Sequence, residues 1–198
     1  MSTDHKVNVK DFSKYFIDSE ITLPESGSLI RVTWMYGTPY HGEKEVFWNS
    51  WFNKRKRDGC PWMVIGDLNE LLFLHEREGS NPGNPTRRRY LERFTASNCL
   101  IDVGFKGQKY TWARKENGIV VLHERIDRAF VCEDWLLSWP ESGVTHLARM
   151  GSDHIPILFT SNPQLRMRRA QFKFEAQWAE EEESHLVIKD SCDCDANN

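Results

Sequence analysis

The sequence predicts a mixed α/β fold in which helices and strands pack in layers. Apolar stretches typical of strands alternate irregularly with stretches of helical periodicity, without a regular strand–helix–strand repeat. The 198 residues are enough for one domain with a sizeable core, and eight tryptophans indicate a large buried aromatic mass. With 39% hydrophobic and 28% charged residues, the composition is that of an ordinary globular protein.

The first part of the chain predicts three strands, a helix and a fourth strand. Residues 6–23 alternate loosely between apolar and polar side chains, which favours two short strands, and residues 29–36 predict a buried strand. Residues 42–57 place aromatic side chains at helical spacing, with basic residues in the last turn, where the helix dipole favours them. The apolar run 61–65 predicts a short strand that ends abruptly in the sequence GDLNE.

The second part predicts further helices and strands in mixed order. A helix is expected after Thr86, which follows a loop rich in Gly, Asn and Pro. Residues 116–118, Glu-Asn-Gly, predict a hairpin turn between two strands. A short helix near 134–139 then precedes strands at 144–148 and 155–160.

Cysteines and charge indicate the cellular setting and the class of partner. Five scattered cysteines without a C-x-x-C pair, no apolar leader and no membrane-length stretch favour an intracellular protein. The net charge of -3 conceals basic clusters at 54–57, 87–89 and 166–169 and an acidic run at 180–183. A polyanion would therefore be bound through local patches rather than through the overall charge.

Two short motifs place polar side chains at strand ends. Asp67 and Asn69 are two residues apart, so they project to the same side of an extended chain, at a position where ligand sites gather in α/β sheets. Arg125 and Asp127 repeat this spacing in the sequence ERIDRAF. Taken alone, an Asx turn explains the first pair, and a solvated strand face with an ion pair explains the second.

The adjacent residues Asp153 and His154 lie between a Gly-Ser turn and an apolar run. His154 is a candidate general acid or base, hydrogen-bond donor to a transition state, or metal ligand. The absence of a second histidine four residues on and of a nearby cysteine cluster argues against zinc. A lone histidine is more often structural, but the neighbouring carboxylate favours a functional role. The arginines at 87–89 are either a solvated face or a phosphate-binding cluster.

Taken together and in order, Tyr36, G-D-x-N, T-W, R-I-D-R and S-D-H resemble the motifs of the endonuclease/exonuclease/phosphatase superfamily. From about His5 to about Asp190 the chain is most similar to the endonuclease domain of plant LINE-type (non-LTR) retrotransposons. The G-D-x-N and S-D-H motifs are highly specific as a pair. The stretches that carry the resemblance are VTWMYGTP, PWMVIGDLNELL, NCLIDVGFKGQKYTW, HERIDRAFVCEDWLLSWPESGVTHLARMGSDHIPIL and FKFEAQW.

The resemblance implies a four-layer α/β sandwich, in which two packed mixed sheets are flanked by helices. It implies hydrolysis of phosphodiesters or phosphomonoesters with Mg²⁺, for which Mn²⁺ can substitute. The implied partner is DNA, bound through its phosphates, with no membrane and no organic cofactor. Such an activity is expected in the nucleus.

The resemblance also implies roles for individual residues. Asp67 would orient or deprotonate the attacking water and bind metal, and Asn69 would hold the phosphate. His154 would donate to the phosphoryl oxygens, with its orientation fixed by Asp127, while Asp153 would help to bind metal. The other expected contacts to phosphate or nucleic acid are Tyr36, Thr111, Ser152, Arg125, Arg87 and Arg88.

One departure from the family pattern predicts a truncated domain over residues 1–162. Family members begin with a strand carrying an Asn and a strand ending in a Glu that is the principal Mg²⁺ ligand, and no acidic residue in the first 23 positions has that context. We therefore expect weakened Mg²⁺ binding, with an uncovered sheet edge and apolar surface. Residues 163–190 are expected to form a basic, then acidic helical linker, and residues 191–198 a disordered tail.

Three functions remain open at this point. The first is a Mg²⁺-dependent DNA-nicking endonuclease domain derived from a non-LTR retrotransposon and impaired by the missing Glu. The second is an inactive relic that at most binds nucleic acid through its arginine clusters. The third, a cellular phosphatase or abasic-site nuclease, is the least favoured, because residues 98–158 match retroelement sequence closely.

Overall fold

The computed structural model describes residues 5–24, 26–54, 58–79 and 87–162. The chain divides into two units, Met1–Pro163 and Gln164–Asn198, and all the described residues belong to the first. The expected linker and tail lie outside the described residues, so the domain boundary at 162 stays a prediction.

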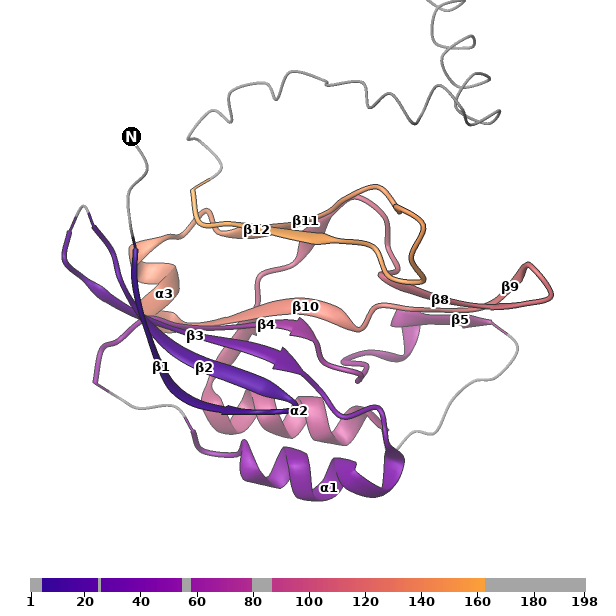
Figure 1. Ribbon diagram of the computed structural model, residues 1–198, viewed down its shortest axis with the longest axis horizontal. Coiled ribbons are helices and arrows are strands. Elements are labelled where there is room, and N and C mark those ends of the chain that lie inside the picture. The colour runs from indigo at the N-terminus through magenta and orange to yellow at the C-terminus, as the bar shows by residue number, and fades with distance from the viewer. Residues whose placement is uncertain (1–4, 25, 55–57, 80–86, 163–198) are drawn as a thin grey trace, which may run out of the picture. The chain divides into compact units, whose positions relative to one another are not determined.

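A six-stranded sheet forms the centre of the domain, with strand order β1-β2-β3-β4-β10-β6 (Figure 1). The first three strands form an antiparallel meander, β3 and β4 run parallel, and β10 is antiparallel to both of its neighbours. The strands of this sheet are β1 (Lys6–Ser13), β2 (Phe16–Thr22), β3 (Leu29–Tyr36), β4 (Trp62–Asp67), β6 (Leu100–Asp102) and β10 (Asp127–Cys132).

Two helices, α1 (His41–Ser50) and α2 (Arg87–Asn98), cover one face of this sheet (Figure 1). Trp48 of α1 and Phe94 of α2 are fully buried, with their ring centroids 5.3 Å apart. Burial of each such side chain contributes on the order of 2 kcal/mol, so the aromatic residues that predicted a large core also hold the helices against the sheet.

A second sheet, of order β12-β11-β7, packs on the opposite side of the six-stranded sheet from α1 and α2 (Figure 1). Val144 of this sheet and Trp135 of the short helix α3 belong to the same buried cluster as the six-stranded sheet. A third, small sheet has the order β5-β9-β8. The elements outside the central sheet are β7 (Phe105–Lys106), β11 (Gly143–His146), β12 (Ile157–Thr160), α3 (Glu133–Ser138), the 3₁₀ turn Leu74–Glu76, β5 (Arg77–Gly79), β8 (Trp112–Glu116) and β9 (Ile119–Glu124).

The predicted fold class, a mixed α/β fold with several sheets flanked by helices, is confirmed. The hairpin predicted at 116–118 is also present, with Asn117 and Gly118 at φ values of 53° and 79°, as a two-residue hairpin turn requires. The helix predicted over 42–57 ends at Ser50. None of the described helices combines the length and the apolar character needed to cross a membrane.

A row of apolar side chains on the six-stranded sheet is open to solvent. The strand register places Phe12, Ile17 and Trp34 side by side on β1, β2 and β3, and these residues are 74%, 47% and 48% exposed. All eight residues of β1 are exposed. The apolar surface that the sequence led us to expect is therefore present, and we call these three residues the apolar row.

Candidate active site

Asp67 stands at the end of β4, where the backbone turns sharply. Gly66 before it has φ +143°, and a Cβ there would lie 2.0 Å from the carbonyl oxygen of Met35, so only glycine fits. The backbone N–H of Asn69 donates to Asp67 Oδ1 at 2.9 Å, which closes the Asx turn anticipated from the sequence. The turn thus fixes the Asp67 carboxylate at the end of the strand.

The side-chain amide of Asn69 forms a hydrogen bond to the second carboxylate oxygen of Asp67. Its Nδ2 donates to Asp67 Oδ2 at 3.1 Å and to the carbonyl oxygen of Gly37 at 2.7 Å. A side-chain amide has two hydrogens, and both are used here. In this conformation the Asn69 side chain orients Asp67, and its expected contact with phosphate stays a prediction.

Asp127 begins β10 and pairs with Asp67 across the sheet, and Tyr36 pairs with Asp67 from β3. Residues that pair directly on neighbouring strands project from the same face, so these three side chains point to one side. Tyr36 is 48% exposed there. The apolar row lies on the same face, because Trp34 precedes Tyr36 by two residues and pairs with Ile65.

His154 completes the group from the segment before β12. Its Nδ1 lies 3.0 Å from Asp127 Oδ2 and 3.2 Å from Oδ1. An ionised carboxylate only accepts hydrogen bonds, so Nδ1 is the donor, and Nε2 is turned toward Asp67, 3.9 Å from its Oδ2. The His–carboxylate pair expected from the resemblance therefore has the geometry of a hydrogen bond.

Asp67, Asp127 and His154 each offer a ligand atom within 4.8 Å of the others. Burial, and then the neighbouring Asp127, raise the pKa of Asp67 from 3.8 to about 6. The hydrogen bond to Asp127 raises the pKa of His154, although burial opposes this. The negative charge of the two carboxylates is thus only partly neutralised by His154. Carboxylate oxygens are the hard ligands that divalent cations prefer. The residues present could hold a divalent metal ion.

A buried ion pair fixes the loop after Asp67 from the side of the helices. Lys44 of α1 donates from Nζ to the carbonyl oxygen of Asn69 and to Glu70 Oε1, both at 2.6 Å, and both side chains are buried. Sequence reasoning missed this pair. A lysine and a glutamate separated by 26 residues carry no pattern that links them.

Thr111 lies inside the protein rather than on a surface that meets nucleic acid. Its side chain is fully buried, and its Oγ1 accepts hydrogen bonds from the backbone N–H groups of Ile126 and Asp127, each at 3.0 Å. The expected nucleic-acid contact at Thr111 is corrected accordingly, because no substrate reaches a fully buried hydroxyl.

Arg125 is also buried, which corrects two expectations. Its side chain is only 7% exposed and bonds Glu76 Oε1 at 2.9 Å and Asp102 Oδ1 at 3.0 Å. Arg128 binds the other oxygens of the same two carboxylates. Arg125 therefore belongs to a buried four-residue charge network, not to a solvated strand face, and its guanidinium is not available for nucleic acid.

Two residues of the S-D-H motif form hydrogen bonds beside His154, and their expected roles stay predictions. Asp153 accepts a hydrogen bond from Trp112 Nε1 at 3.0 Å, which lowers the pKa of Asp153, and it is not part of the metal-binding group found among the described residues. Ser152 is exposed, and its Oγ accepts the backbone N–H of His154 at 3.1 Å.

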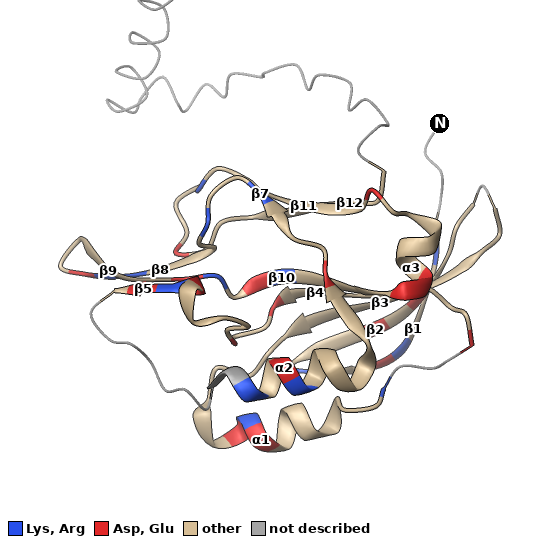
Figure 2. Ribbon diagram, turned by 180° about the vertical axis from the view of Figure 1, so that it is seen from behind, with Lys and Arg blue, Asp and Glu red and all other residues tan. Residues whose placement is uncertain are grey.

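The side chains of Arg87 and Arg88 lie outside the described residues. In Figure 2 the described charges on α1 and α2 have both signs.

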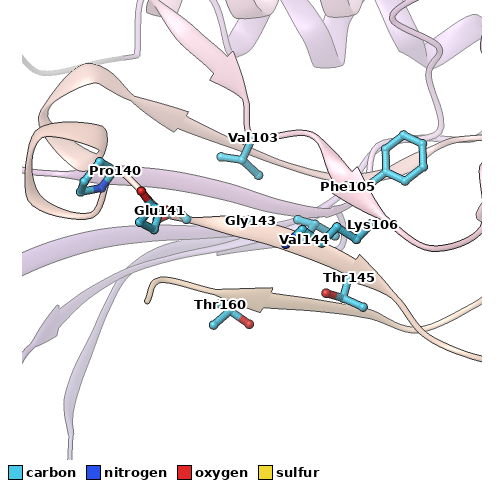
Figure 3. Close-up of a pocket in the computed structure, with 10 residues that line it drawn as sticks. Val103, Phe105, Lys106, Pro140, Glu141, Gly143, Val144, Thr145 and Thr160 are labelled. Carbon is cyan, nitrogen blue, oxygen red and sulfur yellow. The ribbon is translucent and has the colours of Figure 1, made fainter. Parts of the chain in front are cut away.

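The cavity drawn in Figure 3 lies elsewhere, between β7, β11 and the turn after α3. It has a volume of about 290 Å³, and among the described residues only Lys106 and Glu141 bring charge to its lining. None of the three residues of the metal-binding group lines it. The group at the strand ends is therefore separate from this cavity.

Comparison with known proteins supports the fold. No family model and no curated protein matches the chain. Among solved structures, the endonuclease domain of TRAS1, a telomere-specific non-LTR retrotransposon, is similar with a TM-score of 0.55, 18% identity, and coverage of 79% of this chain and 69% of that one. At this identity the similarity shows a shared fold.

Two further solved structures match less closely. A mannosyl-6-phosphatase from Bacteroides thetaiotaomicron has a TM-score of 0.48 at 12% identity, covering 78% of this chain and 67% of that chain. An endonuclease/exonuclease/phosphatase family protein from Leptotrichia buccalis has a TM-score of 0.45 at 13% identity, covering 79% and 71%.

Proposed function

We propose that this domain is a divalent-metal-dependent phosphodiesterase that nicks DNA. The convergence of Asp67, Asp127 and His154 at adjoining strand ends carries the proposal. Two carboxylates and an imidazole are the groups that metal-assisted hydrolysis of a phosphate ester needs. The fold shared with a retrotransposon endonuclease domain supports DNA as the substrate.

Each residue of the group has a part in such a reaction. A Mg²⁺ ion bound by Asp67 and Asp127 would stabilise charge on the phosphoryl group. With its pKa raised to about 6, Asp67 is ionised above neutral pH and can accept a proton from the attacking water. Because Nδ1 of His154 donates to Asp127, a protonated ring directs its Nε2–H at a phosphoryl oxygen. Tyr36, which is exposed beside Asp67, would contact the phosphate.

We further propose that the domain derives from a plant non-LTR retrotransposon and would act in the nucleus, on the basis of the ordered motifs in its sequence. A second candidate function is a weakly active or inactive relic. It is favoured by the ligand set, which contains two carboxylates and no glutamate among the described residues. Since the principal Mg²⁺ ligand of the family that the sequence resembles is a glutamate, a set without one predicts weaker binding of the ion.

A plasmid-nicking assay distinguishes the two candidates. We expect the purified chain to convert supercoiled plasmid to the open-circular form in 10 mM Mg²⁺ or Mn²⁺, on the order of the concentration that weak sites require, and not in EDTA. The variant Asp127→Asn should be inactive, because it loses a metal ligand and the partner of His154. The absence of nicking with either metal would reject the endonuclease and leave the relic.

Asp67 should make the metal-free protein less stable as pH rises. Its pKa in the folded chain is about 6, against an ordinary 3.8, so the proton it retains stabilises the fold at low pH, and that contribution is lost as pH rises through about 6. The difference corresponds to at most about 3 kcal/mol. The raised pKa of His154 acts in the same direction. We therefore expect Asp67→Asn to raise the melting temperature at pH 8 in EDTA.

The same variant should lose the stabilisation that metal gives the folded chain. Added Mn²⁺ is expected to raise the melting temperature of the wild-type chain more at pH 8 than at pH 5, because ionised carboxylates bind it. Asp153→Asn, whose carboxylate lies outside the group, is the control and should keep the Mn²⁺ effect. Loss of the effect in Asp153→Asn, with retention in Asp67→Asn, would reverse our assignment of the metal ligands.

A further inference from the structure

Thr111 connects the strand that carries Asp127 to the segment that carries His154. Its buried Oγ1 accepts the N–H groups of Ile126 and of Asp127 itself. Its backbone carbonyl accepts the N–H of Ile155, the residue after His154, at 2.8 Å. A single residue is therefore bonded directly to the backbone of Asp127 and to the immediate neighbour of His154.

Trp112 extends this connection along the same segment. Trp112 forms an isolated β-bridge with His154, and its indole Nε1 donates to Asp153 Oδ2 at 3.0 Å. The next backbone N–H, that of Ala113, donates to the carbonyl oxygen of Asp153 at 3.0 Å. Three consecutive residues thus hold the segment 153–155 in one position.

These bonds matter because His154 and Asp127 do not lie on paired strands. β10 pairs with β4 and β6, whereas β12, which follows His154, pairs with β11. The hydrogen bond of 3.0 Å between His154 and Asp127 therefore joins β10 to the segment that precedes β12. Its length depends on what fixes the segment 153–155 relative to the start of β10. Thr111 contacts both parts, and Trp112 contacts the segment 153–155.

We propose that Thr111 and Trp112 form a positioning clamp that sets the separation of Asp127 and His154 and thereby the metal affinity of the site. This inference rests on the proposed function for its metal-dependent readout. Thr111 is fully buried and is not part of the metal-binding group, so it is a positioning residue. Loss of such supporting hydrogen bonds typically costs about 10–100-fold in metal affinity or activity.

The variants Thr111→Val and Thr111→Ser test the clamp. Valine keeps the shape of threonine but leaves two backbone N–H groups without an acceptor, whereas serine keeps the hydroxyl. The matched control is Thr33→Val. Thr33 is another fully buried threonine, and its hydroxyl bonds Asp18 and Trp62 in the sheet.

Three measurements decide the outcome: the Mn²⁺ dissociation constant from calorimetry, the rate of plasmid nicking, and the Asp127–His154 distance in crystal structures of the variants. In Thr111→Val we expect the Nδ1–Oδ2 contact of 3.0 Å to open, Mn²⁺ to bind about tenfold more weakly, and kcat to fall with little change in KM. Thr111→Ser should restore all three quantities. Thr33→Val should lower the melting temperature alone.

An unchanged Asp127–His154 distance in Thr111→Val would overturn the clamp, whatever the activity. So would an unchanged Mn²⁺ affinity together with a lower melting temperature, because Thr111 would then serve stability only. If the wild-type chain bound no Mn²⁺, the proposed function would fail, while the crystallographic distance would still decide whether Thr111 positions the pair.

Discussion

Replacing His154 with alanine is expected to lower kcat for DNA nicking by about 10²–10⁴-fold, the usual contribution of a positioned proton donor. Its Nε2 faces Asp67 across 3.9 Å, and the hydrogen bond from Nδ1 to Asp127 fixes the ring in that direction. Because the interaction with the phosphoryl oxygens strengthens as charge develops on them, the loss should appear in kcat more than in KM. Initial rates of plasmid nicking over a range of substrate concentrations measure both.

The matched control for this variant is His123→Ala. His123 is a partly buried histidine of β9 that stacks on Tyr110 with ring centroids 5.3 Å apart, and it is not part of the metal-binding group. We expect His123→Ala to nick DNA at nearly the wild-type rate. Equal loss in the two variants would mean that the effect at His154 is structural, and full activity in His154→Ala would reject its assigned role.

Replacing Glu76 with alanine is expected to cost about 3–5 kcal/mol of the free energy of unfolding, the range observed when one member of a buried ion pair is removed. Glu76 bonds Arg125 and Arg128 and also accepts the backbone N–H groups of Leu72 and Phe73. Without it, two buried guanidinium groups would share the single carboxylate of Asp102. For a domain of ordinary marginal stability, a loss of this size leaves little of the folded state.

Urea denaturation followed by tryptophan fluorescence measures this loss. The control is Glu116→Ala, which removes an ion pair with Arg114 at 3.2 Å whose side chains are 50% and 60% exposed. Exposed pairs contribute at most about 1 kcal/mol, so this variant should keep nearly all its stability. If the two variants lost similar amounts, the network would not have the stabilising role that its burial suggests.

Local patterns in the sequence predicted the elements of the fold better than the partners of its charged residues. Alternation over residues 6–23 and the Asn-Gly turn at 117–118 depend on neighbours in the chain, and both features are present in the structure. The bonds of Arg125 to Glu76 and Asp102 span 49 and 23 residues. No local pattern indicates a partner so far away along the chain. The i, i+2 spacing of Arg125 and Asp127 was therefore interpreted as a solvated strand face.

The candidate site shows the same limit. The spacing of Asp67 and Asn69 correctly predicted an Asx turn, because that turn is local. The approach of Asp127 to Asp67 depends on β10 lying beside β4, and a chain separation of 60 residues hides this from any local pattern. Only the resemblance to a family brought these residues together in advance. The same resemblance led us to expect that Thr111 meets nucleic acid, whereas its hydroxyl is bonded to two N–H groups inside the protein.

The apolar row on β1, β2 and β3 bears on how long the protein would survive in a cell. Phe12, Ile17 and Trp34 present to water the kind of contiguous apolar strand surface that incompletely folded chains expose. Chaperones and proteases act on such surfaces whether or not the rest of the domain is well packed. The amount of this protein present at any time would then be governed by its turnover, and a catalytic defect at the metal site would leave that amount unchanged.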